Sequence, residues 1–338
     1  MRDAAGAERC PGCSGLWVVA GRYELGSVLG RGGTATVFAG HDRQSGEAIA
    51  IKVLTVSDHR DWKALELFER GTAILRGLAH PGFPRIHAFV KDGLRAYQVR
   101  QYYGAGSLEQ LVHGGLRLDR RRVHFLLKAL LELLDHLHTR TPAVLHRDVK
   151  PANIVFASKS PLQPVLVDFD AAAAHGPAGS GTTIVVSPGY SAPEQLAGDG
   201  QPASDLYSLG MTMLFVLTGR APLELPRKDG KPDLCGVLAG LEPATRLVIE
   251  RLCAIDLDTR YRSARDALRE LAGLLAPVKA QTEPSAWLLK LEAGGASLFR
   301  IAVGVLLGLV VIWLVFSVRA LNGTAGDTTQ RRGMGSHR

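Results

Sequence analysis

The sequence predicts an α+β fold with two lobes, a small β-rich lobe followed by a larger helical one, and one membrane helix near the C-terminus. Short β-rich runs separated by turn residues extend from Arg22 to about Tyr103, and one helical stretch near 62–78 interrupts them. From Ser107 onward apolar residues recur at spacings of three and four, which is typical of helices. A chain of 338 residues also exceeds the usual size of a single core, so two lobes or domains are expected.

The predicted domain layout follows from these patterns. Periodic apolar residues give way to a stretch with Pro, Gly and Ser residues after the helical lobe, which is typical of a linker. From the N-terminus, the parts are an extension (1–22), a small lobe (23–103), a helical lobe (104–277), a linker (278–297), a membrane helix (298–318) and a tail (319–338).

The composition is that of a folded protein with no nucleic-acid partner. Hydrophobic residues make up 46% of the chain and charged residues 21%, which argues against disorder over most of its length. The net charge is +8, but the Lys and Arg residues are scattered rather than gathered into one stripe. No recognisable nucleic-acid-binding module is present, so we expect no nucleic acid among the partners.

The cysteines indicate a reducing compartment. Four cysteines are too few and too spread for a disulfide framework, and the first residues lack the apolar run of a signal peptide. Cys10 and Cys13 have the spacing of a zinc knuckle, but a closed zinc site needs four ligands, so metal binding there requires ligands from a partner. Buried structural thiols are the simpler interpretation for Cys235 and Cys253.

Two features of the small lobe suit a nucleotide. Gly30, Gly32 and Gly33 follow the first strand, where a backbone without side chains can fold over phosphates with its N–H groups inward, although glycines also serve simple hairpins. The strand 48–53 then carries one lysine, Lys52, among apolar residues. A buried ammonium is costly unless it meets an anion, and nucleotide phosphates would supply one. An edge-strand lysine that reaches water is the alternative.

In the helical lobe, apolar spacing predicts three helices and a hairpin. The helices are expected over Val123–His138, Asp205–Thr218 and Glu242–Ala254. The stretch from Phe156 to Leu166 is expected to form a β-hairpin.

The most specific motif comes just before that hairpin. It is His146-Arg147-Asp148-Val149-Lys150-Pro151-Ala152-Asn153, and Asp168-Phe169-Asp170 follows it at a fitting distance. With the glycine loop and Lys52 upstream, this order resembles the protein kinase superfamily, specifically the bacterial serine/threonine kinases related to the eukaryotic ones, over roughly Tyr23 to Pro277. The resemblance implies a bilobal kinase fold and ATP-dependent phosphorylation of protein substrates. It also implies ATP and Mg²⁺ as cofactors, with Mn²⁺ as an alternative metal.

The resemblance also implies roles for individual residues. Asp148 would accept the proton of the substrate hydroxyl, and Lys150 would neutralise the moving γ-phosphoryl group; a lysine there favours Ser/Thr over Tyr substrates. Asn153 and Asp168 would coordinate the magnesium ions through oxygen. The expected ATP contacts are Gly30, Gly32, Gly33, Val37, Lys52 and the hinge residues Gln101, Tyr102 and Tyr103.

Further family positions imply structural and regulatory roles. Glu194 would pair with Arg260, and Asp205 would support the catalytic loop from its helix. Ser187 stands where a threonine is usual and keeps a hydroxyl able to bond Asp148 and Lys150. Thr182 and Thr183 are candidate autophosphorylation sites whose phosphate Arg147 would receive; loop threonines without a role are the alternative.

The helix before His80 departs from the family pattern. The glutamate that should pair with Lys52 falls at Gly71, so only Glu66 and Glu69 lie nearby, and neither is on the expected face. Residues two apart point about 200° from each other on a helix, so Glu69 would substitute only after a register shift.

Three more departures concern the cleft itself. Asp170 replaces the usual glycine, which adds a charge beside the metal site and restricts the loop. Arg100 occupies the gate of the adenine pocket, where an apolar residue is common, and Ala35 replaces the third glycine of the loop. Two alternatives to an active kinase therefore remain open: a nucleotide-binding pseudokinase, and a membrane-tethered adaptor that uses the Cys10 and Cys13 segment.

The predicted membrane helix contains a run without charge. Residues 301–318 are 18 such positions, about 27 Å of helix, close to the hydrocarbon thickness of a bilayer. The run is apolar on all faces and Trp313 lies near one end, which favours a membrane span over a buried core helix. Flanking charges do not settle orientation, but use of ATP places the kinase domain in the cytoplasm. We expect the lipid bilayer as a partner, with self-association of kinase domains in its plane.

Overall fold

The computed structural model describes residues 17–32, 35–56, 61–159, 162–174, 186–228 and 231–273. Several predictions lie outside these residues: the Cys10 and Cys13 site, Gly33, Thr182 and Thr183, and the linker, membrane helix and tail over 278–338. Within the described residues, no helix has both the length and the apolar character needed to span a bilayer.

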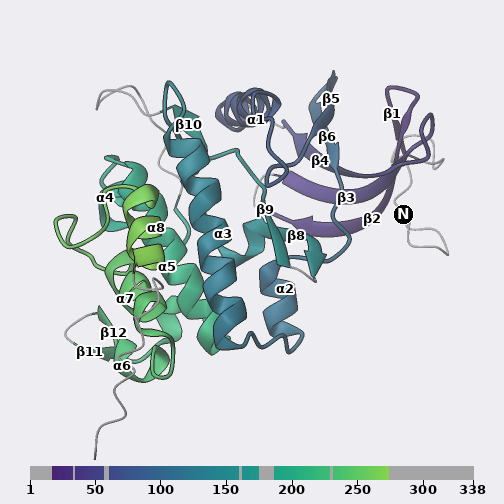
Figure 1. The fold of residues 1–338 in the computed structure, drawn as a ribbon. Helices are drawn as coiled ribbons and strands as arrows, with labels where there is room; N and C mark the ends of the chain where they lie inside the picture. The colour runs from purple at the N-terminus through teal and green to yellow at the C-terminus, as the bar shows by residue number, and fades with distance from the viewer. Residues whose placement is uncertain are drawn as a thin grey trace, which may run out of the picture. The chain divides into compact units, whose positions relative to one another are not determined.

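A six-stranded antiparallel sheet forms the N-terminal region, in the order β1-β2-β3-β4-β6-β5 (Figure 1). A short turn over 20–22 joins β1 to β2, and helix α1 (Asp61–Arg76) intervenes between β4 and β5 as the sequence predicts. The strands are β1 (Val18–Val19), β2 (Tyr23–Arg31), β3 (Ala35–Asp42), β4 (Ala48–Thr55), β5 (Ile86–Asp92) and β6 (Arg95–Gln101).

Alternation along β4 divides the sheet into two faces. Ile49, Ile51 and Val53 pack on one face with buried residues of β2, β3 and β6. Leu54 points to the other face, where it packs with Leu65 and Phe68 of α1. Since side chains two apart along a strand share a face, Lys52 lies on the same side of the sheet as Leu54. The apolar residues on both faces of β4 therefore fix which way Lys52 points.

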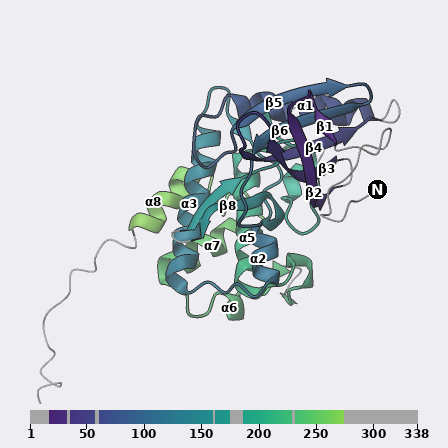
Figure 2. The same cartoon turned by 90° about the vertical axis from the view of Figure 1, so that its right-hand side faces the viewer.

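The helical region is built around α3 (Arg120–His138), and Figure 2 shows it with the other helices from the side. Its further helices are α2 (Leu108–His113), α4 (Pro193–Leu196), α5 (Pro202–Thr218), α6 (Leu234–Val237), α7 (Pro243–Leu252) and α8 (Ala264–Gly273), with 3-10 turns η1 (Pro151–Asn153) and η2 (Pro222–Glu224). Short strand pairs complete it: β7 (Val144–Leu145) with β10 (Ala173–Ala174), β8 (Ile154–Lys159) with β9 (Leu162–Leu166), and β11 (Arg227–Lys228) with β12 (Lys231–Pro232).

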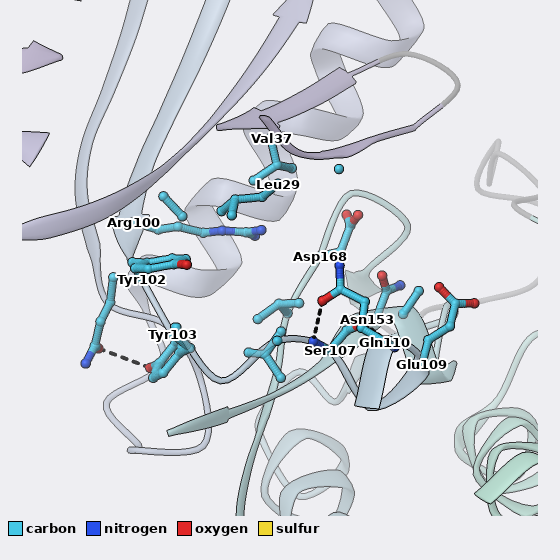
Figure 3. Close-up of a pocket in the computed structure, with 18 of the residues that line it drawn as sticks. Leu29, Val37, Arg100, Tyr102, Tyr103, Ser107, Glu109, Gln110, Asn153 and Asp168 are labelled. Carbon is cyan, nitrogen blue, oxygen red and sulfur yellow. Dashed lines mark hydrogen bonds between the residues drawn. The ribbon is translucent and has the colours of Figure 1, made fainter. Parts of the chain in front are cut away.

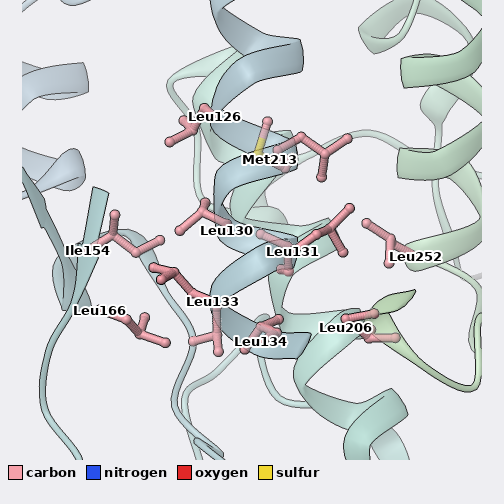
Figure 4. Packing of buried hydrophobic residues seen from close by; sticks show 14 of the residues in the cluster. Leu126, Leu130, Leu131, Leu133, Leu134, Ile154, Leu166, Leu206, Met213 and Leu252 are labelled. Carbon is pink, nitrogen blue, oxygen red and sulfur yellow. The ribbon is translucent and has the colours of Figure 1, made fainter. Parts of the chain in front are cut away.

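Leucines of α3 hold this region together. Figure 4 shows them between Ile154 and Leu166 of the β8–β9 hairpin on one side and Leu206 and Leu252 on the other. Burying one such side chain contributes roughly 1.5–3 kcal/mol. The helix that carries the core thus also packs against the hairpin that separates the sequence motifs at 146–153 and 168–170.

The predicted helices and hairpin are confirmed, with small shifts at their ends. Helix α3 begins at Arg120 because Asp119 caps it, accepting a hydrogen bond from the amide of Arg122. Helix α5 ends where Gly219 adopts a positive φ of 71°. One prediction about the cysteines is wrong. Cys253 is buried as expected, but Cys235 is exposed. Cys235 lies on α6, a helix of 4 residues that is too short for all of its side chains to be buried.

Candidate active site

A cavity of about 460 Å³ lies where the sheet meets the helical region. Figure 3 shows Leu29 and Val37 on one side, Arg100, Tyr102 and Tyr103 at one end, and Asp168 facing the space between. Of the residues expected to contact ATP, Gly30, Val37, Gln101, Tyr102 and Tyr103 line this cavity. Gly32 does not line it and instead closes the strand turn through a hydrogen bond from its amide to the carbonyl of Ala35.

Lys52 lies deeper and bridges two carboxylates. Its Nζ is 2.7 Å from Oδ1 of Asp168 and 2.7 Å from Oδ2 of Asp170. Burial alone would lower the pKa of Lys52, but these two carboxylates outweigh it and raise the pKa above its usual value. Lys52 therefore remains charged, and it is not the edge-strand lysine of the alternative interpretation.

Among the described side chains of α1, none pairs with Lys52. Glu69 forms an ion pair with Lys91, and Glu66 lies 2.8 Å from Lys63, so both acidic residues near the expected position have other partners. The register shift that would bring Glu69 to Lys52 does not occur. The second carboxylate beside Lys52 is Asp170 instead, a role that the sequence analysis did not assign to it.

Four polar side chains come together around the loop that carries Asp148. Asn153 donates through Nδ2 to the Oδ2 (2.8 Å) and backbone oxygen (2.9 Å) of Asp148. Nζ of Lys150 lies 2.9 Å from the same Oδ2 and donates to Oγ of Ser187 at 2.9 Å. Oγ of Ser187 in turn donates to Oδ1 of Asp148 at 2.5 Å. The carboxylate of Asp148 is thus fixed from both sides.

Asp205 of α5 holds the backbone of this loop, as the sequence predicts. Its carboxylate accepts hydrogen bonds from the amides of His146 (2.8 Å) and Arg147 (2.7 Å) and from Nε2 of His138 (2.9 Å). Burial would raise the pKa of Asp205, but the bonds from His138 and His146 outweigh it and keep the pKa low. Arg147 takes a positive φ of 64°, a strained conformation that these bonds stabilise.

Glu194 and Arg260 form the predicted pair. Nη1 of Arg260 lies 2.6 Å from Oε1 of Glu194, and the guanidinium also donates to the backbone oxygens of Ala203, Ala254 and Ile255. Arg260 is only 1% exposed. This pair ties the segment before α5 to the turn after α7, away from the cavity.

The side chains present suit a magnesium ion. Asn153 and Asp168 both line the cavity, and the amide of Val167 bonds the backbone oxygen of Asn153, which sets the two positions side by side. Their oxygens are the hard ligands that Mg²⁺ prefers, with waters and phosphates completing its shell. No group of three or more His, Cys, Asp and Glu residues gathers as a metal site among the described residues.

Arg100 extends into the cavity from β6 and is only 7% exposed (Figure 3). Its Nη1 makes no hydrogen bond within the described residues, and burial lowers the pKa of its guanidinium. The predicted gate position is therefore occupied by a buried cation that faces the ligand space.

Sequence reasoning missed several residues that line the cavity. The apolar walls are Leu29, Ala50, Val155 and Val167, and the polar rim includes Ser107, Glu109 and Gln110. The period of two along the strand with Lys52 is a signal that would have found Ala50. No local pattern marks the rim, because α2 reaches the cavity only through packing.

Comparison with known proteins gives a family and several relatives. The model of the protein kinase domain matches residues 23–252. A probable serine/threonine-protein kinase of Streptomyces coelicolor is 33% identical over 211 residues, covering 60% of this chain and 31% of the relative. Serine/threonine-protein kinase D of Synechocystis is 28% identical over 272 residues (75% and 52%), and serine/threonine-protein kinase PknA of Nostoc is 30% identical over 267 residues (74% and 47%). The chain thus spans between 31% and 52% of the length of these relatives.

Proposed function

The chain belongs to the protein kinase family, in its bacterial serine/threonine branch, and from this premise we propose that it is a membrane-anchored kinase that transfers the γ-phosphoryl group of ATP to protein Ser and Thr hydroxyls. One observation carries the proposal. Two hydrogen bonds, from Lys52 to Asp168 and from Asn153 to Asp148, bring four chemically suited side chains from distant parts of the sequence to one cleft.

Asp148 is the proposed base. Its oxygens accept hydrogen bonds from Ser187 and Asn153 and form an ion pair with Lys150, and a carboxylate with about four lone-pair sites can still accept a hydrogen bond from an incoming hydroxyl. Asp148 takes that proton as the hydroxyl oxygen bonds to the γ-phosphorus and the bond from this phosphorus to the bridging oxygen breaks, releasing ADP. The ammonium of Lys150 offsets charge on the transferred group.

Lys52 is the proposed phosphate ligand on the sheet side. Its charged ammonium lies next to Asp168, so phosphates that enter the cavity meet a cation already held in place. Asn153 and Asp168 would hold Mg²⁺, which when bound neutralises charge on the phosphate oxygens.

Autophosphorylation is part of the proposal. Nε and Nη1 of Arg147 are buried and make no hydrogen bond within the described residues. Arg70 lies near enough to add to the positive field at Arg147. Two arginines can bind a phosphate through charge-assisted hydrogen bonds, and Thr182 and Thr183 are the proposed acceptors.

The membrane anchor is proposed from the sequence alone. A single helix over 298–318 would hold the chain in the bilayer, with the kinase domain on the cytoplasmic side, where ATP is available. Concentration in the membrane plane would favour encounters between kinase domains and with protein substrates.

The activity is tested with the full chain in detergent, Mg²⁺ and γ-labelled ATP, followed by phosphoamino-acid analysis of an acceptor protein. Label on phosphoserine and phosphothreonine that is absent with D148N supports the kinase. Nucleotide binding without transfer supports the second candidate, a pseudokinase, which the departures at Gly71 and Asp170 favour. The absence of both would favour the adaptor.

The anchor is tested separately by alkaline extraction of membranes that contain the full chain. A chain that stays in the membrane pellet supports the helix over 298–318, and deletion of those residues should release it. A full chain that appears in the soluble fraction would rule the anchor out.

A further inference from the structure

The buried face of α1 carries no acid toward Lys52. Leu65, Phe68, Thr72 and Leu75 are buried along this face together with Gly71. The Phe68 ring centre lies 5.9 Å from Nζ of Lys52, so the lysine faces this helix without finding a carboxylate on it.

Gly71 is in direct contact with the segment that contains Asp168. A Cβ atom at position 71 would lie 2.7 Å from the carbonyl carbon of Phe169, 3.1 Å from the amide nitrogen of Asp170, and closer still to the carbonyl oxygen of Phe169. Real Cβ atoms do not approach backbone this closely. A glycine within a helix costs about 1 kcal/mol relative to alanine, so its presence here needs a compensating contact, and this close approach is one.

The departures at Gly71 and Asp170 therefore form one arrangement. Because Gly71 has no side chain, the backbone of Phe169 and Asp170 can lie against α1. From there Asp170 reaches Nζ of Lys52 at 2.7 Å, while Asp168 holds the same atom at 2.7 Å. Asp170 thus supplies the carboxylate that α1 lacks, from a segment whose backbone occupies the space of a side chain at position 71.

We propose that Asp170 is the positioning residue for Lys52, replacing a helix-borne carboxylate, and that it keeps the ammonium in place when Asp168 turns to a metal ion. This rests on the proposed function, because it concerns the lysine that holds the phosphates. Lys52 has two carboxylates, and nucleotide with Mg²⁺ would draw one of them away. Asp170 then remains as the counter-ion.

This arrangement changes which segment would control the position of Lys52. In the family pattern, the lysine and its helix-borne partner meet only when the helix is in place. Here the metal ligand and the counter-ion are two residues apart in one segment. Ordering of residues 168–170 would set Lys52 directly, and displacement of α1 would act on it through the contacts of Gly71 and Phe68 rather than through a carboxylate on the helix.

The test measures the dissociation constant for Mg²⁺·ATP and, in parallel, kcat and both KM values in the full chain. D170N removes the charge with almost no change of shape, and we expect affinity for Mg²⁺·ATP to fall by about 10- to 100-fold, the range of a hydrogen bond to a charged group. The KM for the acceptor protein should stay unchanged. E69Q, which neutralises an acid on α1 that already pairs with Lys91, is the matched control and should bind like the unmodified chain.

Rescue separates positioning from a general packing role. D170E keeps the charge and should recover most of the loss. D170G, which removes the side chain altogether, should bind as weakly as D170N. Melting temperatures establish that each variant is folded.

The outcomes distinguish this inference from the kinase proposal. Unchanged affinity in D170N, with the unmodified chain active, would overturn the positioning role and leave the kinase intact. Weaker binding in D170N with rescue by D170E, in a chain that transfers no phosphate, would support the positioning role and reject the kinase. A chain that does not bind Mg²⁺·ATP at all would overturn both.

Discussion

Oγ of Ser187 lies 2.5 Å from Oδ1 of Asp148, so the end of the segment before α4 is bonded directly to the carboxylate proposed as the base. Oγ of Ser187 also accepts a hydrogen bond from Nζ of Lys150. One hydroxyl therefore fixes the relative positions of the proposed base, the cation beside it and the segment that leads to Pro193.

Removal of this hydroxyl should impair phosphoryl transfer. S187A deletes a hydrogen bond to a charged group, worth about 1.5–3 kcal/mol, so kcat/KM for an acceptor protein should fall by about tenfold or more. S187T keeps the hydroxyl and should retain most of the activity. Steady-state kinetics on both variants are the measurement, and equal rates for S187A and the unmodified chain would show that the contact is dispensable.

Loss of the buried Arg260 should destabilise the fold. R260A leaves three backbone oxygens without their donor and the Glu194 carboxylate with only the hydrogen bond from Ser204, and breaking a buried pair costs about 3–5 kcal/mol. R262A is the matched control, because Arg262 pairs with Asp258 in the open, with exposures of 85% and 90%. Thermal unfolding should show a large drop for R260A and almost none for R262A; similar melting temperatures would contradict the structural role.

The free energy of unfolding should decrease as the pH is lowered, and part of this decrease should come from His124. Burial lowers the pKa of His124, whose Nδ1 lies 2.9 Å from Oγ1 of Thr245. The folded state thus binds the proton less tightly than the unfolded chain. The stabilisation is fully present above the unfolded pKa of about 6.5 and is lost progressively as the pH falls from that value toward the lower pKa of the folded state.

H124Q keeps a polar side chain that does not titrate. Melting temperatures between pH 7.5 and 5.5 should therefore decrease less in this variant than in the unmodified chain. The same decrease in both would show that His124 does not contribute to the acid sensitivity.

The two described cysteines should differ in reactivity. Burial raises the pKa of Cys253 to about 12, so almost none of it is thiolate near neutral pH. Cys235 is exposed. Brief alkylation of the folded chain should modify Cys235 and spare Cys253 until denaturant is added, as peptide mass spectrometry would show. Early modification of Cys253 would mean that the packing around α5 and α7 opens readily.

Much of the fold could be predicted because its elements have regular apolar spacing. Helix α3 buries leucines at intervals of three and four, and β4 alternates between two covered faces, so both patterns are local. Cys235 was misjudged because α6 spans only Leu234–Val237, which is too short for any period to reveal a buried face.

The site was predictable where order along the chain carries the information. The motifs around Lys52, Asp148 and Asp168 occur in the family's order, and the structure brings them to one cleft. The partner of Lys52 was not predictable in this way. Asp170 reaches it only because Gly71 admits the backbone of Phe169, a contact between segments about a hundred residues apart that no local pattern records.

The rate of phosphoryl transfer by the full chain carrying D148N, relative to the unmodified chain at saturating Mg²⁺·ATP, tests the central claim most directly. Loss of a positioned base should lower the rate by roughly 10²- to 10⁴-fold, and at saturating Mg²⁺·ATP any change in nucleotide affinity that D148N causes through its bond to Asn153 does not affect that rate. An unmodified chain that labels its acceptor no faster than D148N would contradict the account, since the transfer would then not depend on this cleft.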